Sequence, residues 1–145
     1  MKATKSTVGW REWVSLPDLG IEHIKVKVDT GARSSALHAF RIKTEEREDG
    51  LWVSFEVHPE QRAKKPIVRC EAPVIDHRTV RDSGGREHER YVIETTVRLG
   101  EQAWPIEVTL TSRDAMGFRM LLGRTAIRRR FLVDSGRSYL IGKRK

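Results

Sequence analysis

Three short motifs in this sequence place an aspartate before a hydroxyl residue and a glycine. They are "VDTGA" from Val28 to Ala32, "RDSGG" from Arg81 to Gly85 and "VDSGRS" from Val133 to Ser138. A carboxylate in such a motif acts either as a general acid or base, or as the first residue of a turn in which its side chain binds nearby backbone. The flanking sequence indicates which role each copy has.

The second and third copies are predicted to be turns. The "RDSGG" motif lies between two alternating segments, and its paired glycines supply the positive φ that a tight hairpin requires. The "VDSGRS" motif lies between two apolar runs near the C-terminus, which is typical of a structural turn.

The first copy differs because Asp29 follows an alternating run, "HIKVKV", and precedes "RSSALHAF", which can continue as a second buried strand. Burial disfavours the charged form of a carboxylate, so Asp29 needs a partner or a function. Two interpretations stay open from local sequence: a catalytic carboxylate, or an aspartate that caps its own loop through an Asx turn.

Period-2 alternation predicts many short strands around these motifs. The expected strands are His23–Asp29, Ala36–Ile42, Leu51–Val57, Val74–Val80, Tyr91–Leu99, Trp104–Leu110 and Tyr139–Ile141. One segment looks helical, "LLGRTAIRRRF", with Thr125 as its expected cap. The pattern favours a small, mostly β barrel or sandwich.

The 145 residues are expected to form a single domain, with residues 1–9 and 143–145 flexible and "QRAKKP" in an exposed loop. The net charge is +8, from 28 basic and 20 acidic residues, and predicts attraction to polyanions. Because Cys70 is the only cysteine, one chain has no disulfide framework. With no signal-like start and no membrane-length apolar run, we expect a cytoplasmic protein without membrane contact.

The order of the motifs resembles a known family. A "VDTGA" segment after a strand, then a glycine hairpin, then "MLLGR" is similar to the retropepsin-like aspartic peptidases. More specifically, the chain resembles the bacterial RimB-like family from about Glu12 to Gly142. The segments that carry this resemblance are "EWVSLPDLGI", "KVDTGARSSALHA", "VIDHRTVRDSGGREHERYVIET", "VTLTSRDAMGFRMLLGR" and "FLVDSGRSYLIG". It implies a mostly β, retropepsin-like closed barrel subunit with one short C-terminal helix.

Carboxylate-driven peptide hydrolysis needs two carboxyl groups that share one site and one proton. One Asp29 per chain supplies half of this, so a two-fold homodimer is expected to pair Asp29 with Asp29 of its mate. Thr30 is expected to hold the two loops together across the dyad. Gly31 lets backbone amides approach the carboxylates, and Ala32 keeps the floor of the site small.

The resemblance implies that the hairpin tipped by Ser83, Gly84 and Gly85 is a flap over the substrate. Guanidinium groups match carboxylates bidentately, so arginines near these motifs are candidate substrate contacts. The candidates are Arg33, Arg78, Arg86, Arg90, Arg113 and Arg124. The resemblance further implies a glutamate-rich tail of a ribosomal protein as substrate and an ATP-grasp glutamate ligase as partner.

The RimB-like family also carries the label of an ATP-dependent zinc protease, but the sequence lacks the H-E-x-x-H and P-loop patterns. No cofactor is therefore expected. Cys70 is expected to be a structural thiol. The four tryptophans, Trp10, Trp13, Trp52 and Trp104, are expected to anchor the core or an interface, since none lies in an interleaved basic and aromatic motif.

Two alternatives remain. In the first, Asp29 would pair with Asp134 inside one chain, because "VDTGARS" and "VDSGRS" are alike, although their flanks do not repeat. Otherwise the protein is a catalytically weak or inactive basic β module that binds ribosomal RNA or an acidic peptide, in which case binding falls steeply with salt and Asp29 is irrelevant.

Overall fold

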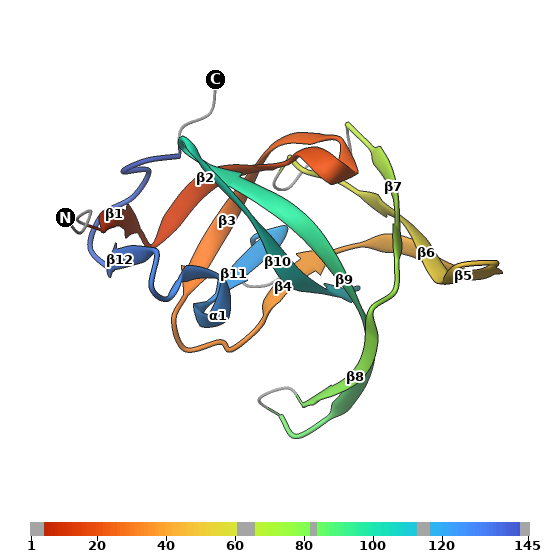
Figure 1. The fold of residues 1–145 in the computed structure, drawn as a ribbon. Coiled ribbons are helices and arrows are strands. Elements are labelled where there is room, and N and C mark those ends of the chain that lie inside the picture. The colour runs from red at the N-terminus through yellow and green to blue at the C-terminus, as the bar shows by residue number, and fades with distance from the viewer. Residues whose placement is uncertain (1–4, 61–65, 82–83, 113–116, 143–145) are drawn as a thin grey trace.

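The structure is a computed structural model that describes residues 5–60, 66–81, 84–112 and 117–142. Strands dominate it, and Figure 1 shows their arrangement. In chain order the elements are β1 (Ser6–Gly9), β2 (Arg11–Leu16), the 3-10 helix η1 (Pro17–Leu19), β3 (Ile21–Asp29), β4 (Ser35–His38), β5 (Phe40–Arg47), β6 (Gly50–Val57), β7 (Val68–Pro73), β8 (Asp76–Arg81), β9 (Glu87–Leu99), β10 (Gln102–Thr111), β11 (Met120–Gly123), α1 (Arg124–Ile127) and β12 (Phe131–Asp134).

The largest sheet has the strand order β10-β4-β11-β3-β2-β9-β8, and β9 also pairs antiparallel with β10. The strand β10 is at one edge of this order and β9 is next to the other edge. Their pairing therefore connects the two ends of the sheet by hydrogen bonds. Within the sheet β11 lies between β3 and β4, parallel to β3 and antiparallel to β4. The segment between Asp29 and Ser35 must therefore cross the end of β11 to reach β4.

Two smaller sheets lie outside this order. The strands β5, β6 and β7 form one, and the β5–β6 hairpin projects from the body of the molecule (Figure 1). The short strands β1 and β12 form a parallel pair beside the N-terminus. The β8–β9 hairpin, at one edge of the largest sheet, projects from the body of the molecule at the bottom of Figure 1.

Alternation builds the core, as the sequence predicts. On β3 the side chains of Ile24, Val26 and Val28 are buried, while the lysines between them are only half-buried. From β4 and β11, Leu37 and Leu122 are fully buried against this row. The last residue of β3 is Asp29, so a strand of the core delivers this carboxylate to the start of a loop.

The mostly β fold class is confirmed, as is the short late helix. The predicted cap of that helix is wrong: Gly123 occupies the N-cap position and Thr125 lies inside the helix. The Thr125 hydroxyl instead donates to Arg33 O at 2.7 Å, because the loop after Asp29 passes directly beside α1.

Three other expectations need correction. Tyr139–Ile141 is no strand, because the buried Glu12 carboxylate accepts the amides of residues 140, 141 and 142 at 2.7–3.1 Å. Ser6–Gly9, expected to be flexible, forms β1 with Val8 buried. The run from Ala36 to Ile42 is split between β4 and β5.

The split occurs at Ala39, whose amide donates to Thr111 O at 2.8 Å at the point where the chain leaves the main sheet. The expected loop at residues 61–65 and the tail at residues 143–145 lie outside the described residues. None of the helices in the described ranges is long and apolar enough to cross a membrane.

Candidate functional site

The loop after β3 is closed by Asp29 itself. Gly31 N–H donates to Asp29 Oδ1 at 3.0 Å, and Ala32 N–H donates to Asp29 O at 3.2 Å. The Asp29 residue is half-buried, whereas Thr30 and Gly31 are exposed at the tip of the loop. The Asx turn considered from the sequence is therefore present, and it leaves Asp29 Oδ2 outside that hydrogen bond.

The end of β11 and the start of α1 brace this loop from beneath. Gly123 is the register partner of Asp29, and its amide donates to Ser35 Oγ at 3.1 Å. Arg124 N–H donates to Ala32 O at 2.8 Å. A Cβ atom on Gly123 would lie 2.6 Å from the carbonyl carbon and oxygen of Ser34, so only glycine allows this close passage. The "MLLGR" segment thus supports the Asp29 loop through Gly123 and Arg124.

Arg124, one of the candidate substrate arginines, contacts the loop as well. Its Nη1 donates to Gly31 O at 3.3 Å from an exposed position. Its guanidinium thus lies at the Asp29 loop, and Arg124 does not line the cleft beside that loop.

A cleft of about 890 Å³ lies beside the Asp29 loop, between β8, β10 and α1. Arg33 follows the loop, Arg78 and Arg81 come from β8, and Arg130 follows α1; all four line the cleft. One carboxylate, Glu107 of β10, lines it too, so the lining carries four positive charges and one negative. Two of the predicted substrate arginines, Arg33 and Arg78, are therefore brought together here.

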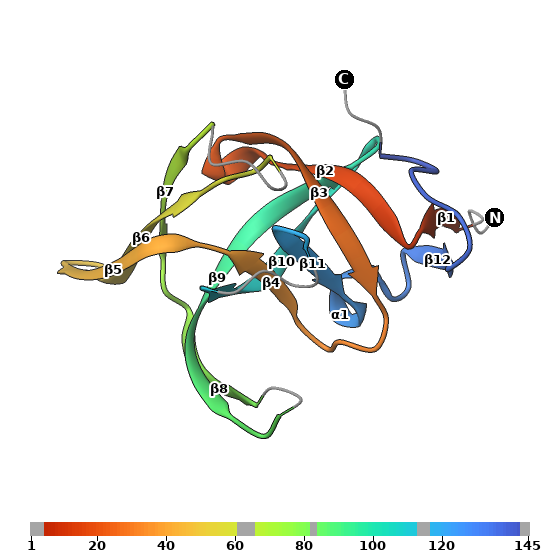
Figure 2. The same cartoon turned by 180° about the vertical axis from the view of Figure 1, so that it is seen from behind.

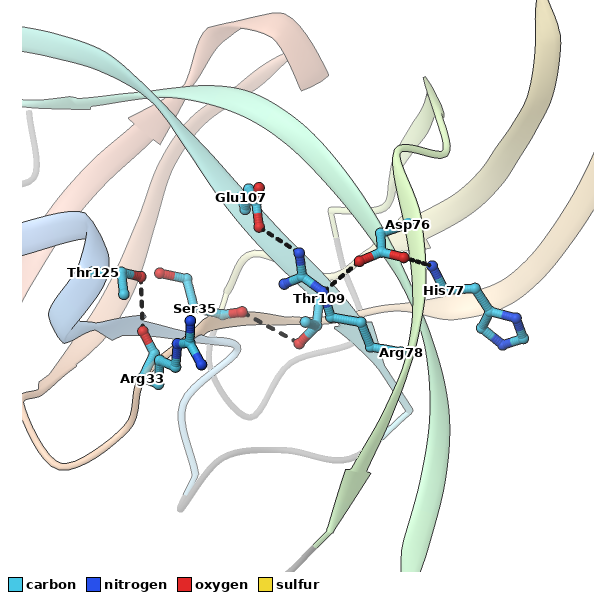
Figure 3. A network of polar contacts seen from close by, with 8 residues as sticks. All are labelled: Arg33, Ser35, Asp76, His77, Arg78, Glu107, Thr109 and Thr125. Atoms are coloured by element: carbon cyan, nitrogen blue, oxygen red, sulfur yellow. Dashed lines mark hydrogen bonds and ion pairs between the residues drawn. The ribbon is translucent and has the colours of Figure 1, made fainter.

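Arg78 is held between two carboxylates (Figure 3). Its Nε donates to Asp76 Oδ2 at 2.6 Å and its Nη2 to Glu107 Oε1 at 2.8 Å. The hydrogen bond from Arg78 lowers the pKa of the Asp76 carboxyl, and the two carboxylates, Asp76 first, raise the pKa of Arg78. Because these groups are exposed, solvent screens the interaction. The contact with Glu107 ties the β8–β9 hairpin to β10.

Arg90 of β9 makes a second link between the β8–β9 hairpin and β10. It is the register partner of Arg78, and its Nη1 donates to Thr109 Oγ1 at 3.5 Å. Thr109 Oγ1 in turn donates to Ser35 O at 3.2 Å, at the start of β4 (Figure 3). Two hairpin arginines thus point toward β10, one of them through Thr109 toward the chain that follows Asp29.

The other candidates are spread more widely. Gly84, Gly85 and Arg86 are exposed at the end of the β8–β9 hairpin, and Gly85 has a φ of 83°, as a tight turn requires. Ser83 and Arg113 lie outside the described residues.

Sequence reasoning missed Glu107 and Trp104 as parts of the cleft, and it named Asp76 only as part of a strand. The signal for Glu107 was its position: it alternates with the buried Ile106 and Val108 of β10, so it faces outward. Which strand lies opposite that face is a tertiary fact that the alternation does not contain.

Cys70 and the groups of potential metal ligands lie as follows. Burial raises the pKa of the Cys70 thiol to about 12, and its Sγ donates to Leu19 O at 3.5 Å, so at neutral pH it stays protonated. Within the described part of the chain, no three His, Cys, Asp or Glu side chains are grouped as a metal ion would require.

The fold has a counterpart among solved structures. A crystal structure of a Legionella pneumophila protein of unknown function (DUF785) superposes with a TM-score of 0.77 and 27% identity, over 94% of this chain and 98% of that one. The sequence model of the RimB-like family, described as "Retropepsin-like aspartic endopeptidase RimB", matches residues 7–144. The chain belongs to this family.

Curated relatives carry a different name. A protein of Shewanella pealeana named "Probable alpha-L-glutamate ligase" is 46% identical over 144 residues, which is 99% of this chain and 31% of that protein. A protein of Parasynechococcus marenigrum with the same name is 51% identical over 138 residues, 95% of this chain and 30% of that protein. The chain thus spans about a third of the length of these relatives.

Proposed function

We propose that residues 1–145 act as a single retropepsin-like domain, and that two copies form an aspartic peptidase. The observation that carries this proposal is the position of Asp29. It lies at the end of a core strand, in a loop braced by Gly123 and Arg124, beside a cleft lined by Arg33 and Arg78. This arrangement combines a held carboxylate with a basic substrate groove.

In the proposed mechanism Asp29 of each copy faces its mate across a two-fold axis, with a water molecule between them. Two carboxyl groups about 3 Å apart cannot both ionise easily, so the pair holds one proton. As the water oxygen adds to the carbonyl carbon, the ionised Asp29 takes a proton from the water and the protonated one gives its proton to the carbonyl oxygen. The tetrahedral intermediate then collapses: its nitrogen takes the proton from the first Asp29, a hydroxyl proton returns to the second, and the C–N bond breaks to release the amine and the new carboxyl group. Gly31 N–H holds Oδ1 of each carboxylate in place, and Thr30 links the loops.

The proposed substrate is an acidic, glutamate-rich peptide tail, such as one on a ribosomal protein. The four arginines of the cleft support this, since guanidinium donors match carboxylates, and Arg78 and Arg81 already bind carboxylates of the chain, Arg78 those of Asp76 and Glu107 and Arg81 that of Glu87. The proposed flap, the β8–β9 hairpin, contributes Arg78 to this cleft and Arg90 to a neighbouring pocket, with Arg86 and the glycines at its tip. Ala32 and Ser83 complete the proposed peptide contacts.

The proposed functional partner is a glutamate ligase. The relatives named as such contain a segment similar to nearly the whole chain within a protein about three times as long. An enzyme that adds glutamates and one that removes them share the same tail as product and substrate, which is a reason for the two to occur together.

The test is mass spectrometry of a peptide ending in several glutamates, with EDTA present throughout. We expect the wild type to shorten it and the Asp29→Asn variant to leave it intact. Size-exclusion chromatography and circular dichroism show whether both are folded dimers. An active, folded Asp29→Asn protein would rule out the mechanism.

A further inference from the structure

The outward face of β2 and β3 combines basic and aromatic side chains. Alternate residues of both strands are buried, which leaves Arg11 and Trp13 of β2 and His23, Lys25 and Lys27 of β3 on the opposite, half-buried face. Figure 2 shows these two strands crossing the front of the molecule in that view. These five residues are called the β2–β3 face.

The register places the cations and rings in rows. Arg11 is the partner of Lys27, and Trp13 is the partner of Lys25. Lys25 Nζ lies 5.9 Å from the Trp13 ring, and the Trp13 and His23 rings meet edge to face at 5.8 Å. The β2–β3 face thus interleaves basic and aromatic groups in space, although the sequence of neither strand does so.

Further rings continue the pattern at its edges. Arg11 Cζ lies 4.7 Å from the Trp10 ring and 5.1 Å from the Tyr139 ring. Phe118 meets Trp10 edge to face at 6.0 Å and lies 5.7 Å from Lys25 Nζ. Pairing between the strands brings rings and cations together here although the sequence around Trp10 and Trp13 has no such motif, and the expected role of these tryptophans as core or interface anchors stays a prediction.

The five residues of the β2–β3 face include the cations Arg11, Lys25 and Lys27 and no carboxylate. Arg11 and Lys27 are like charges in directly paired positions, an arrangement that costs stability in a sheet. On the next strand Arg98 of β9 is paired with Ser15 of β2 and is exposed. Two described carboxylates lie beside the His23 end of this face: Glu60 is 3.7 Å from His23 Nε2, and Glu22 lines a pocket together with Trp13 and His23.

We infer that the β2–β3 face binds single-stranded RNA. The cations track the phosphates, and the tryptophan and histidine rings offer surfaces on which bases stack without regard to sequence. An acidic peptide would use the charges alone and would leave the rings without a role. The face belongs to other strands than the arginine cleft, so the inference stands independently of any hydrolysis.

The test is fluorescence anisotropy of a short labelled oligouridylate over a series of salt concentrations. The double variant Arg11→Gln/Lys27→Gln removes two cations from the face. It should reduce the slope of log affinity against log salt by roughly 1.4, since each phosphate contact to a single strand contributes about 0.7. The matched control is Arg128→Gln/Arg129→Gln, which removes the same charge from exposed positions at the end of α1 and should leave the slope unchanged.

A second variant tests stacking. Trp13→Leu keeps an apolar side chain but removes the ring, and should weaken binding by at least about fivefold at an unchanged slope. The inference is overturned if the two double variants behave alike, if Trp13→Leu has no effect, or if the wild type does not bind. It is also overturned if a duplex of equal length, or polyglutamate at equal charge, competes as well as single-stranded RNA.

Discussion

The loops that begin at Asp29 and Asp134 are closely similar in local structure. Each aspartate ends a strand whose parallel neighbour places a glycine opposite it, Gly123 for Asp29 and Gly9 for Asp134. Each Oδ1 accepts an amide two residues on, at 3.0 Å from Gly31 and 2.9 Å from Gly136. Each main-chain oxygen accepts an amide three residues on.

Their surroundings differ. The Asp29 loop lies within the largest sheet, is covered by the start of α1, and continues through Arg33 into a basic cleft. The Asp134 loop ends a two-stranded sheet at the periphery, and no residue beside it lines that cleft. The two loops thus share the same turn, and they differ in the elements packed around them and in their distance from the basic cleft.

The largest difference is expected between the two matched carboxylate substitutions. Asp29→Asn should lower kcat/KM for a glutamate-tailed peptide by about a hundredfold or more, since acid–base groups typically contribute that much. The amide oxygen of asparagine can still accept from Gly31 N–H, so the loop should keep its shape. Asp134→Asn should stay within about twofold of the wild type. Equal losses of kcat/KM for the two variants in steady-state assays would show that the two loops do not differ in function.

The glycines that follow or face the two aspartates give the next test. Gly123→Ala places a methyl group against the Ser34 backbone and should cost about 1–3 kcal/mol, as overpacking does. The control is Gly136→Ala, whose nearest neighbour would be Asp134 Oδ1 at 3.4 Å, an ordinary contact, and which should change stability little; the glycine opposite Asp134, Gly9, is as closely packed as Gly123, with Arg137 O at 2.3 Å from an added Cβ atom. Urea denaturation measures both. Similar midpoints for the two variants would show that the Asp29 loop is not closely braced.

The basic cleft should distinguish the loops through substrate binding. Arg78→Gln should raise KM for a glutamate-tailed peptide by about tenfold, because a charge-assisted hydrogen bond contributes about 1.5–3 kcal/mol and the site is exposed. The control is Arg137→Gln, an exposed arginine beside Asp134, which should leave KM unchanged. A KM that is insensitive to Arg78 would place the peptide elsewhere.

The smallest effect concerns pH at the base of the hairpin. The pKa of Asp76 is lowered below its ordinary 3.8 by Arg78, so the contact stabilises the folded hairpin fully above pH 3.8. That stabilisation is lost as pH falls through the lower, folded value. NMR should show the His77 amide, which donates to Asp76 Oδ1 at 2.8 Å, titrating below pH 3.8. The transition should vanish in Asp76→Asn; a transition below pH 3.8 that persists in this variant would contradict the assignment to Asp76.

Much of this architecture follows from the sequence. Period-2 alternation identified β3 and β10, and the glycines of "RDSGG" identified the β8–β9 hairpin, because these signals are local. Two other features depend on residues far apart in the sequence. The strand β11 inserts between β3 and β4, and the Glu12 carboxylate accepts the amides of residues 140–142, where the sequence predicted part of a strand. For the same reason the sequence did not predict that Glu107 lines the cleft or that cations and rings form rows on the β2–β3 face, since both arise from pairing between distant segments.

The central claim is that Asp29 acts as one half of a site shared by two chains. Wild type and Asp29→Asn are mixed in equal amounts, co-refolded, and assayed at constant total concentration. Random pairing leaves about a quarter of the dimers with two aspartates, so we expect about a quarter of the wild-type activity. The same mixture made with Asp134→Asn should keep full activity. A value of about one half with Asp29→Asn would mean that each chain carries a complete site and would contradict the account.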